Sequence, residues 1–81
     1  MWYIYMIECP IRTLYTGITT DVNRRISEHN SGKGAKYTRT RTPVVLRALF
    51  EANNRSEASK EEYRIKKLTK IEKLKLCDIK Q

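Results

Sequence analysis

The stretch WYIYMIECPIRTLYTGI, residues 2–18, contains two runs that are typical of β-strands. Residues 2–8 and 13–18 are rich in aromatic and β-branched side chains, which favour extended backbone. Pro10 lies between the two runs and cannot donate to a sheet ladder, so it ends the first strand. The stretch therefore predicts a β-hairpin, and hence an antiparallel sheet.

Successive side chains of a strand point to opposite faces, so each run of the hairpin divides into two sets. In the second run, one set is polar or small: Thr13, Tyr15 and Gly17. We expect this set to face away from the main core. If the turn comprises residues 9–11, Tyr5 lies directly opposite Tyr15 on this less apolar face.

Beyond the hairpin, start and stop signals predict further elements. Thr20 and Asp21 begin a helix with a capping hydroxyl and an acid in the first turn, and Thr69 with Glu72 forms a capping box. The expected elements are a helix over about 21–30, a loop over 32–43, a strand over 44–50, a helix over about 55–67 and a final short helix from 69. The order β-β-α-β-α-α indicates the α+β class, with helices packed on an antiparallel sheet.

The composition indicates a small basic protein. The 81 residues include 17 Lys and Arg against 9 Asp and Glu, a formal charge of +8. The length predicts a single domain, 1–81, with one modest core. Such a charge favours a polyanionic partner, with nucleic acid as the leading candidate.

Other function classes find little support. Two cysteines and one histidine give no zinc-ligand spacing. With a single histidine, a Ser-His-Asp or Cys-His hydrolase is unsupported, and Gly32-Lys33-Gly34 is too short for a nucleotide-binding loop. Because no apolar run approaches the ~20 residues of a membrane span, we expect a cytoplasmic protein that has no membrane partner.

The helix expected over 21–30 carries charge on its inward face. The positions i, i+3, i+4 and i+7 of this face are Val22, Arg25, Ile26 and His29. Arg24 lies about 100° away and points towards solvent, so the two adjacent arginines are not equivalent. A charge at the edge of a core is costly unless it is paired or functional.

The helix expected over 55–67 shows the same feature, because its inward positions are Ala58, Glu61, Glu62 and Ile65. One structural interpretation is a buried ion pair between Arg25 and one of these carboxylates. Such a pair rarely stabilises a fold more than apolar residues do. We therefore favour a functional site that contains tyrosines, Arg25, His29 and a carboxylate.

These residue types suit the hydrolysis of phosphodiester bonds. An arginine stabilises charge that develops on a phosphate. A carboxylate can hold a divalent metal, and Mg²⁺ typically takes one or two carboxylates together with waters and phosphate. A tyrosine hydroxyl can accept or relay the proton of an attacking water if nearby cations lower its pKa.

Residues 30–50 contain no acid and several cations: Lys33, Lys36, Arg39, Arg41 and Arg47. Tyr37 lies among them, and cations with an interleaved aromatic are typical of nucleic-acid binding. The alternative is a flexible basic loop with Tyr37 packed on the domain. The lysines between residues 66 and 75 are interpreted as solvated helix faces.

Several segments together resemble the GIY-YIG endonuclease superfamily, and more closely its small stand-alone bacterial branch. They are Tyr3-Ile4-Tyr5, Tyr15-Thr16-Gly17, Asp21-x-x-Arg24-Arg25 with His29, and the segments HNSGKGAKYTRTRTP and EYRIKKLTK. Tyr3 replaces the first glycine of the motif and Thr16 its middle isoleucine. The resemblance implies a three-stranded antiparallel sheet flanked by helices, one divalent metal ion (Mg²⁺ or Mn²⁺) and cleavage of phosphodiester bonds.

The resemblance also implies roles for individual residues. Tyr5 and Tyr15 correspond to the two motif tyrosines. Gly17 corresponds to the motif glycine, which lets backbone or substrate approach closely. Arg25 corresponds to the catalytic arginine, and His29 falls where the family often has a His or Tyr near the scissile phosphate. Glu62 corresponds to the metal-binding glutamate, although Glu61 fits the centre of the helical stripe slightly better.

The leading hypothesis is therefore a metal-dependent endonuclease that acts on DNA, with RNA and branched DNA as further candidate substrates. Its expected nucleic-acid contacts are Arg24, Lys33, Lys36, Tyr37, Arg39 and Arg41. Without an appended DNA-binding domain, we expect weakly selective, salt-sensitive binding. The alternatives are a binding module of the same fold with little or no cleavage, and a structural protein in which an Arg25–Glu62 pair fixes packing.

Overall fold

The computed structural model describes residues 1–10, 13–34 and 42–79, with the backbone alone at 78 and 79. The strands are β1 (Trp2–Cys9), β2 (Thr13–Thr19) and β3 (Val45–Ala52), and the helices are α1 (Val22–Asn30), α2 (Arg55–Lys66) and α3 (Lys70–Ile79). The strands form one antiparallel sheet in the order β2-β1-β3. The predicted α+β class, element order and flanking helices are confirmed.

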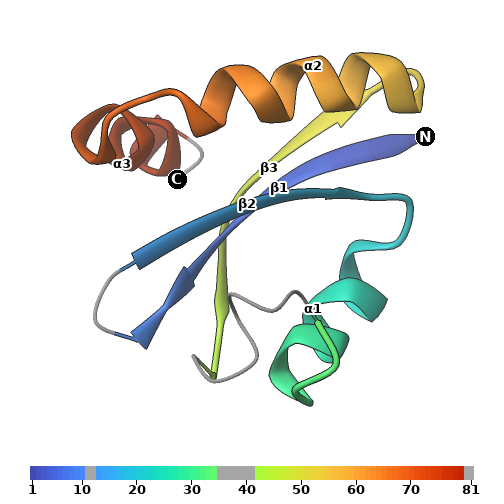
Figure 1. Ribbon diagram of the computed structural model, residues 1–81, viewed down its shortest axis with the longest axis vertical. Helices are drawn as coiled ribbons and strands as arrows, with labels where there is room; N and C mark the ends of the chain where they lie inside the picture. The colour runs from blue at the N-terminus through green and yellow to red at the C-terminus, as the bar shows by residue number, and fades with distance from the viewer. Residues whose placement is uncertain (11–12, 35–41, 80–81) are drawn as a thin grey trace.

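The sheet separates two layers of helices, with α1 on one face and α2 and α3 on the other (Figure 1). Ile4 and Met6 of β1 pack with Ala58 and Ile65 of α2. Tyr5 and its neighbours on the opposite face form a second cluster with Tyr15, Ile26 and Leu49. The predicted division of the hairpin into two faces is therefore right, but two apolar clusters replace the single core that we expected.

The predicted hairpin register is wrong. Tyr5 pairs with Gly17, and Tyr15 pairs with Ile7. The cause is the length of β1, which continues to Cys9 and pairs there with Thr13. A shift by two residues preserves the face of every side chain, so Tyr5 and Tyr15 still share one side of the sheet.

Polar side chains fix where the helices begin. Asp21 is itself the cap of α1 and accepts a hydrogen bond from the Arg24 N–H at 3.1 Å, so Thr20 does not have the capping role that we expected. Asn54 accepts from the Glu57 N–H at 2.9 Å and begins α2. Thr69 and Glu72 form the predicted capping box of α3. Each such cap stabilises its helix by about 1 kcal/mol.

A bulge in β3 positions one side chain away from the core. The pairing of β1 with β3 shifts between Met6 and Ile7, which leaves Arg47 as an extra residue of β3. Such a bulge redirects a side chain, and Arg47 lies 3.5 Å from Glu8.

Asn30, at the end of α1, makes two hydrogen bonds to the backbone of Val44. Its Oδ1 accepts from the Val44 N–H at 2.6 Å, and its Nδ2 donates to the Val44 carbonyl at 3.4 Å. This clamp joins the two ends of the segment 31–43.

Candidate active site

The buried hydroxyl of Tyr5 joins the central strand to α1. The Tyr5 residue is only 1% exposed. Its oxygen accepts a hydrogen bond from Nε of Arg25 at 3.4 Å and lies 3.0 Å from Nε2 of His29. While it accepts from Arg25, the hydroxyl can still donate its own proton to an unprotonated Nε2 of His29.

Gly17 makes room for this hydroxyl. A Cβ atom at position 17 would overlap the hydroxyl end of the Tyr5 ring, which crosses the paired strand at this point. The group that approaches the motif glycine is thus the first motif tyrosine. A side chain at position 17 would displace Tyr5 from its partners on α1.

Tyr15 is the outer member of an aromatic group. Its ring centroid lies 6.5 Å from that of Tyr5 and 5.5 Å from that of His29, with the His29 ring edge-on. Tyr5 and His29 are buried, whereas Tyr15 is half-buried. Of the two tyrosines, Tyr15 is therefore the one with surface available to a substrate.

The two adjacent arginines of α1 differ as the helical pattern predicted. Arg25 has 29% of its side chain exposed and reaches the Tyr5 hydroxyl, whereas Arg24 is 64% exposed. Nη1 of Arg25 donates to Glu28 at 3.0 Å. Within the described residues, Arg25 makes no ion pair with Glu61 or Glu62, so the structural interpretation based on that pair is wrong.

Burial governs the protonation of the Tyr5–His29 pair. It raises the pKa of Tyr5 above the ordinary value of 10.0 and outweighs the hydrogen bond and charge of Arg25, which lower this pKa. The condition under which a tyrosine would relay the proton of the attacking water, a pKa lowered by cations, is therefore not met by Tyr5. Burial, followed by the charge of Arg25, lowers the pKa of His29 below 6.5. Both side chains are consequently neutral at pH 7.

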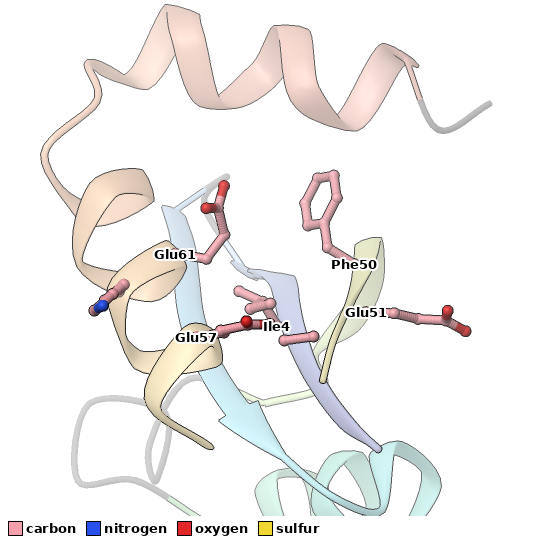
Figure 2. A pocket seen from close by; sticks show the side chains of 7 residues that line it. Ile4, Phe50, Glu51, Glu57 and Glu61 are labelled. Carbon is pink, nitrogen blue, oxygen red and sulfur yellow. The ribbon is translucent and has the colours of Figure 1, made fainter. Parts of the chain in front are cut away.

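The two candidate glutamates of α2 lie in different surroundings. Glu62 has 23% of its side chain exposed, forms an ion pair with Lys66 at 3.2 Å, and its negative charge acts on the pKa of Tyr5. Glu61 is 39% exposed, pairs with Arg64 and lines a groove between α2 and β3 beside Phe50 (Figure 2). Glu62 is thus the carboxylate with an electrostatic connection to the Tyr5 cluster.

The donor set suits a metal with few protein ligands. In the part of the chain that the structure describes, no group of three His, Cys, Asp or Glu side chains could hold a metal. Glu62 supplies a partly exposed carboxylate, and one or two carboxylates with waters and phosphate are a usual Mg²⁺ environment. The residues therefore fit a hard divalent cation that shares its coordination sphere with a substrate.

The expected nucleic-acid contacts are only partly described. Arg24 and Lys33 are exposed, while Lys36, Tyr37, Arg39 and Arg41 lie outside the described residues. Arg47, which the sequence grouped with these cations, belongs to β3 and forms an ion pair with Glu8. Among the described residues, no helix is both long and apolar enough to cross a membrane.

Three residues of the site were missed in the sequence. Glu28 forms an ion pair with Arg25 and also lies 4.0 Å from Arg24. Its spacing of three and four residues from these arginines predicts such helical pairs, so the sequence did contain a signal for Glu28. Gly34 packs so closely on His29 that a Cβ atom would overlap the imidazole. Lys66 extends its Nζ to 5.8 Å from the Tyr15 ring centroid. The last two depend on tertiary structure, so no local signal marks them.

This combination of a three-stranded sheet, paired tyrosines and an inward arginine is that of a nuclease domain. The GIY-YIG catalytic domain matches residues 1–75. The chain belongs to the GIY-YIG family. Members of this family act on nucleic acid and generally use divalent metals.

Similar proteins occur in both archaea and bacteria. A UPF0213 protein of Halobacterium salinarum is 56% identical over 73 residues, which cover 90% of this chain and 95% of the relative. One from Staphylococcus haemolyticus is 49% identical, with 94% and 93% covered. The solution NMR structure of a UPF0213 protein from Bacillus halodurans is 47% identical, with a TM-score of 0.63 and coverage of 99% of this chain and 86% of that chain.

Proposed function

We propose that residues 1–81 act as a single catalytic domain, a divalent-metal-dependent endonuclease that hydrolyses phosphodiester bonds in DNA with weak sequence selectivity. The observation that carries this proposal is the hydrogen-bonded chain from Arg25 through Tyr5 to His29. It holds a partly exposed guanidinium against the sheet. A guanidinium fixed in this way is prepared to stabilise charge on a pentavalent phosphate without reorganisation.

Burial suggests how the two motif tyrosines differ in role. Tyr15 is the half-buried one, and we assign to it the contact with the attacking water. Tyr5, buried and with a raised pKa, is assigned to positioning Arg25. His29 has no exposed surface, so we assign to it the support of Tyr5 in place of direct phosphate contact.

Glu62 is the residue proposed to hold Mg²⁺ or Mn²⁺. When bound, the ion supplies Lewis-acid stabilisation of the phosphate oxygens. Lys66, the present partner of Glu62, remains beside Tyr15 as a cation for the substrate. The charge of Glu62 already acts on Tyr5, which supports its assignment over Glu61.

Weak selectivity follows from the kind of contacts available. Arg24 and Lys33 are exposed cations that suit phosphate groups, and phosphate contacts carry no sequence information. The cations and Tyr37 of residues 36–41 are proposed to add to this surface. Binding is therefore expected to weaken steeply with salt.

Cleavage assays test the proposal directly. Labelled single-stranded, duplex and branched DNA, together with RNA, are incubated with the protein in Mg²⁺, Mn²⁺ or EDTA. Arg25→Ala and Glu62→Gln are expected to remain folded by thermal melting and to lose cleavage. Glu61→Gln, one position away in the same helix, is the matched control and is expected to cleave like the wild type.

Two results would overturn this proposal. If the wild type binds DNA but cleaves no substrate with either metal, the protein is a binding module of the same fold. If Glu61→Gln abolishes cleavage and Glu62→Gln does not, the metal ligand is assigned to the wrong glutamate.

A further inference from the structure

A second charged surface lies on the opposite side of the sheet from α1, where α3 meets the beginning of β2. One hollow of about 220 Å³ is lined by Thr13, Leu14, Lys70 and Lys73. A second, of about 430 Å³, is lined by Glu8, Arg47, Lys70 and Leu74. The two hollows share Lys70, and together we call them the α3 groove.

Local structure brings the cations of the α3 groove together. The Thr69–Glu72 capping box fixes the first turn of α3, so that Lys70 and Lys73, three residues apart, lie on one side of the helix. The bulge of β3 adds Arg47 from the sheet. The groove is thus built by the three strands together with α3.

The bonding capacity of the α3 groove is incomplete. Among the described residues, neither Lys70 nor Lys73 forms an ion pair, and the one acid of the groove, Glu8, already faces Arg47. Two polar atoms of the lining are buried: Thr13 Oγ1, which has no hydrogen-bond partner, and Arg47 Nε, which lies 3.5 Å from Oε1 of Glu8. The ammonium groups of Lys70 and Lys73 are therefore the donors of the groove that phosphate oxygens can reach.

Lysines lie between the α3 groove and Tyr15, which belongs to the aromatic group with Tyr5 and His29. Lys66, at the end of α2, places its ammonium group near the Tyr15 ring. Only residues 67–69 separate it from Lys70 at the start of α3. Because β2 is an edge strand, this series of lysines passes around the edge of the sheet from Tyr15 to the groove.

Another groove of the same protein provides a comparison for the charge of the α3 groove. The groove between α2 and β3 has a similar volume of about 420 Å³, but Glu51, Glu57 and Glu61 line it together with a single cation, Lys60 (Figure 2). Its carboxylates repel phosphate. The face that carries α2 and α3 therefore has one groove that disfavours polyanions and another, the α3 groove, that favours them.

We propose that the α3 groove binds phosphate groups of the nucleic-acid strand outside the scissile bond, and that Lys66, Lys70 and Lys73 guide this strand around the edge of β2. This inference rests on the proposed function, since it takes nucleic acid as the substrate. It assigns a role to lysines that the sequence alone classed as solvated helix faces.

Binding measurements in EDTA test the proposal independently of cleavage. Fluorescence anisotropy of a labelled DNA oligonucleotide is compared for the wild type, Lys70→Gln/Lys73→Gln and Lys60→Gln/Lys75→Gln. Both double variants lose two charges, but the second leaves the α3 groove intact. We expect the groove variant to bind about 5- to 20-fold more weakly, with a salt slope smaller by about 1 to 2.

Equal weakening by the two double variants would overturn the proposal, because net charge alone would then explain it. Amide shifts of Lys70 and Lys73 in NMR spectra separate the two sources of phosphate. Shifts with the oligonucleotide support the proposal. Shifts with inorganic phosphate alone, or with neither, contradict it.

The proposed function and the α3 groove can fail separately. If the wild type binds DNA in EDTA but cleaves no substrate with metal, the nuclease proposal is wrong. The anisotropy comparison then still tests whether the α3 groove binds nucleic acid. Conversely, if the wild type cleaves DNA and the α3-groove variant binds DNA normally, the proposal for the groove is wrong. The nuclease proposal then stands.

Discussion

The Tyr5 hydroxyl and Nε2 of His29 lie 3.0 Å apart, in a hydrogen bond that ties the middle of the sheet to the last turn of α1. Arg25 donates to the same hydroxyl from one turn earlier in the helix. The orientation of the arginine therefore depends on a buried pair that does not itself reach the surface. We therefore distinguish residues that position the site, such as Tyr5 and His29, from residues that are expected to contact the substrate, such as Arg25 and Tyr15.

Removal of the Tyr5 hydroxyl should disturb both folding and activity. Tyr5→Phe leaves Nε2 of His29 without its bond from Tyr5, and we expect a loss of about 1–2 kcal/mol in the free energy of unfolding. Tyr15→Phe, at the half-buried tyrosine, should change stability by less than about 0.5 kcal/mol while abolishing cleavage. Urea unfolding and cleavage rates measure the two effects. Equal stability losses in both variants would contradict the assigned division of roles.

A methyl group at position 17 should displace Tyr5. We expect Gly17→Ala to destabilise the protein by about 1–3 kcal/mol, because the new Cβ overlaps a buried ring. Gly32→Asn is the control, since Gly32 has a positive φ of 81° with open space around it, and asparagine tolerates this conformation. Thermal melting compares the two variants, and a Gly17→Ala protein as stable as Gly32→Asn would show that the strand pairing relaxes easily.

Stability should fall in mild acid because of His29. Its pKa is lowered on folding, so the unfolded chain binds the proton more readily and stability rises with pH. The contribution is fully present above the unfolded pKa of about 6.5 and is lost as the pH falls from there towards the lower folded pKa. His29 is the single histidine, so urea unfolding of His29→Gln between about pH 7.5 and 5.5 should show a flatter pH dependence than the wild type. Parallel curves would rule out this cause.

The Asn30 clamp should support the basic segment that follows α1. Asn30→Ala removes two bonds to Val44, and we expect a loss of about 1 kcal/mol together with weaker DNA binding. Asn23→Ala, at an exposed asparagine of the same helix, is expected to change neither property. Chemical denaturation and anisotropy provide the readouts. Normal DNA binding by the Asn30→Ala protein would separate the clamp from nucleic-acid recognition.

Helical periodicity was sufficient to predict the inward position of Arg25 and His29, because the 3.6-residue period of a nine-residue helix fixes which side chains share a face. Strand alternation likewise predicted the common side of Tyr5 and Tyr15. The pairing of Tyr5 with Gly17 was not predictable, because register depends on where the first strand ends, and Cys9 continued it.

Properties that arise from assembly also escaped prediction. The pKa of Tyr5 is raised chiefly by burial, and residue types along the chain do not show how deeply a side chain is buried. The opposite charges of the groove beside α2 and of the α3 groove likewise emerge only when the three strands and both helices meet. Sequence patterns report the neighbours of a residue along one element, whereas these properties depend on neighbours across elements.

The clamp between Asn30 and Val44 has a consequence for how target preference can change. Gly34 is packed on His29, and Val44 is tied to Asn30, so the chain is anchored on both sides of the basic residues between them. Exchange or lengthening of that stretch leaves the spacing of Tyr5, Arg25 and His29 unaltered. Under the proposed function, we therefore expect that exchange of this segment changes the choice of substrate and leaves the chemistry of the site unchanged.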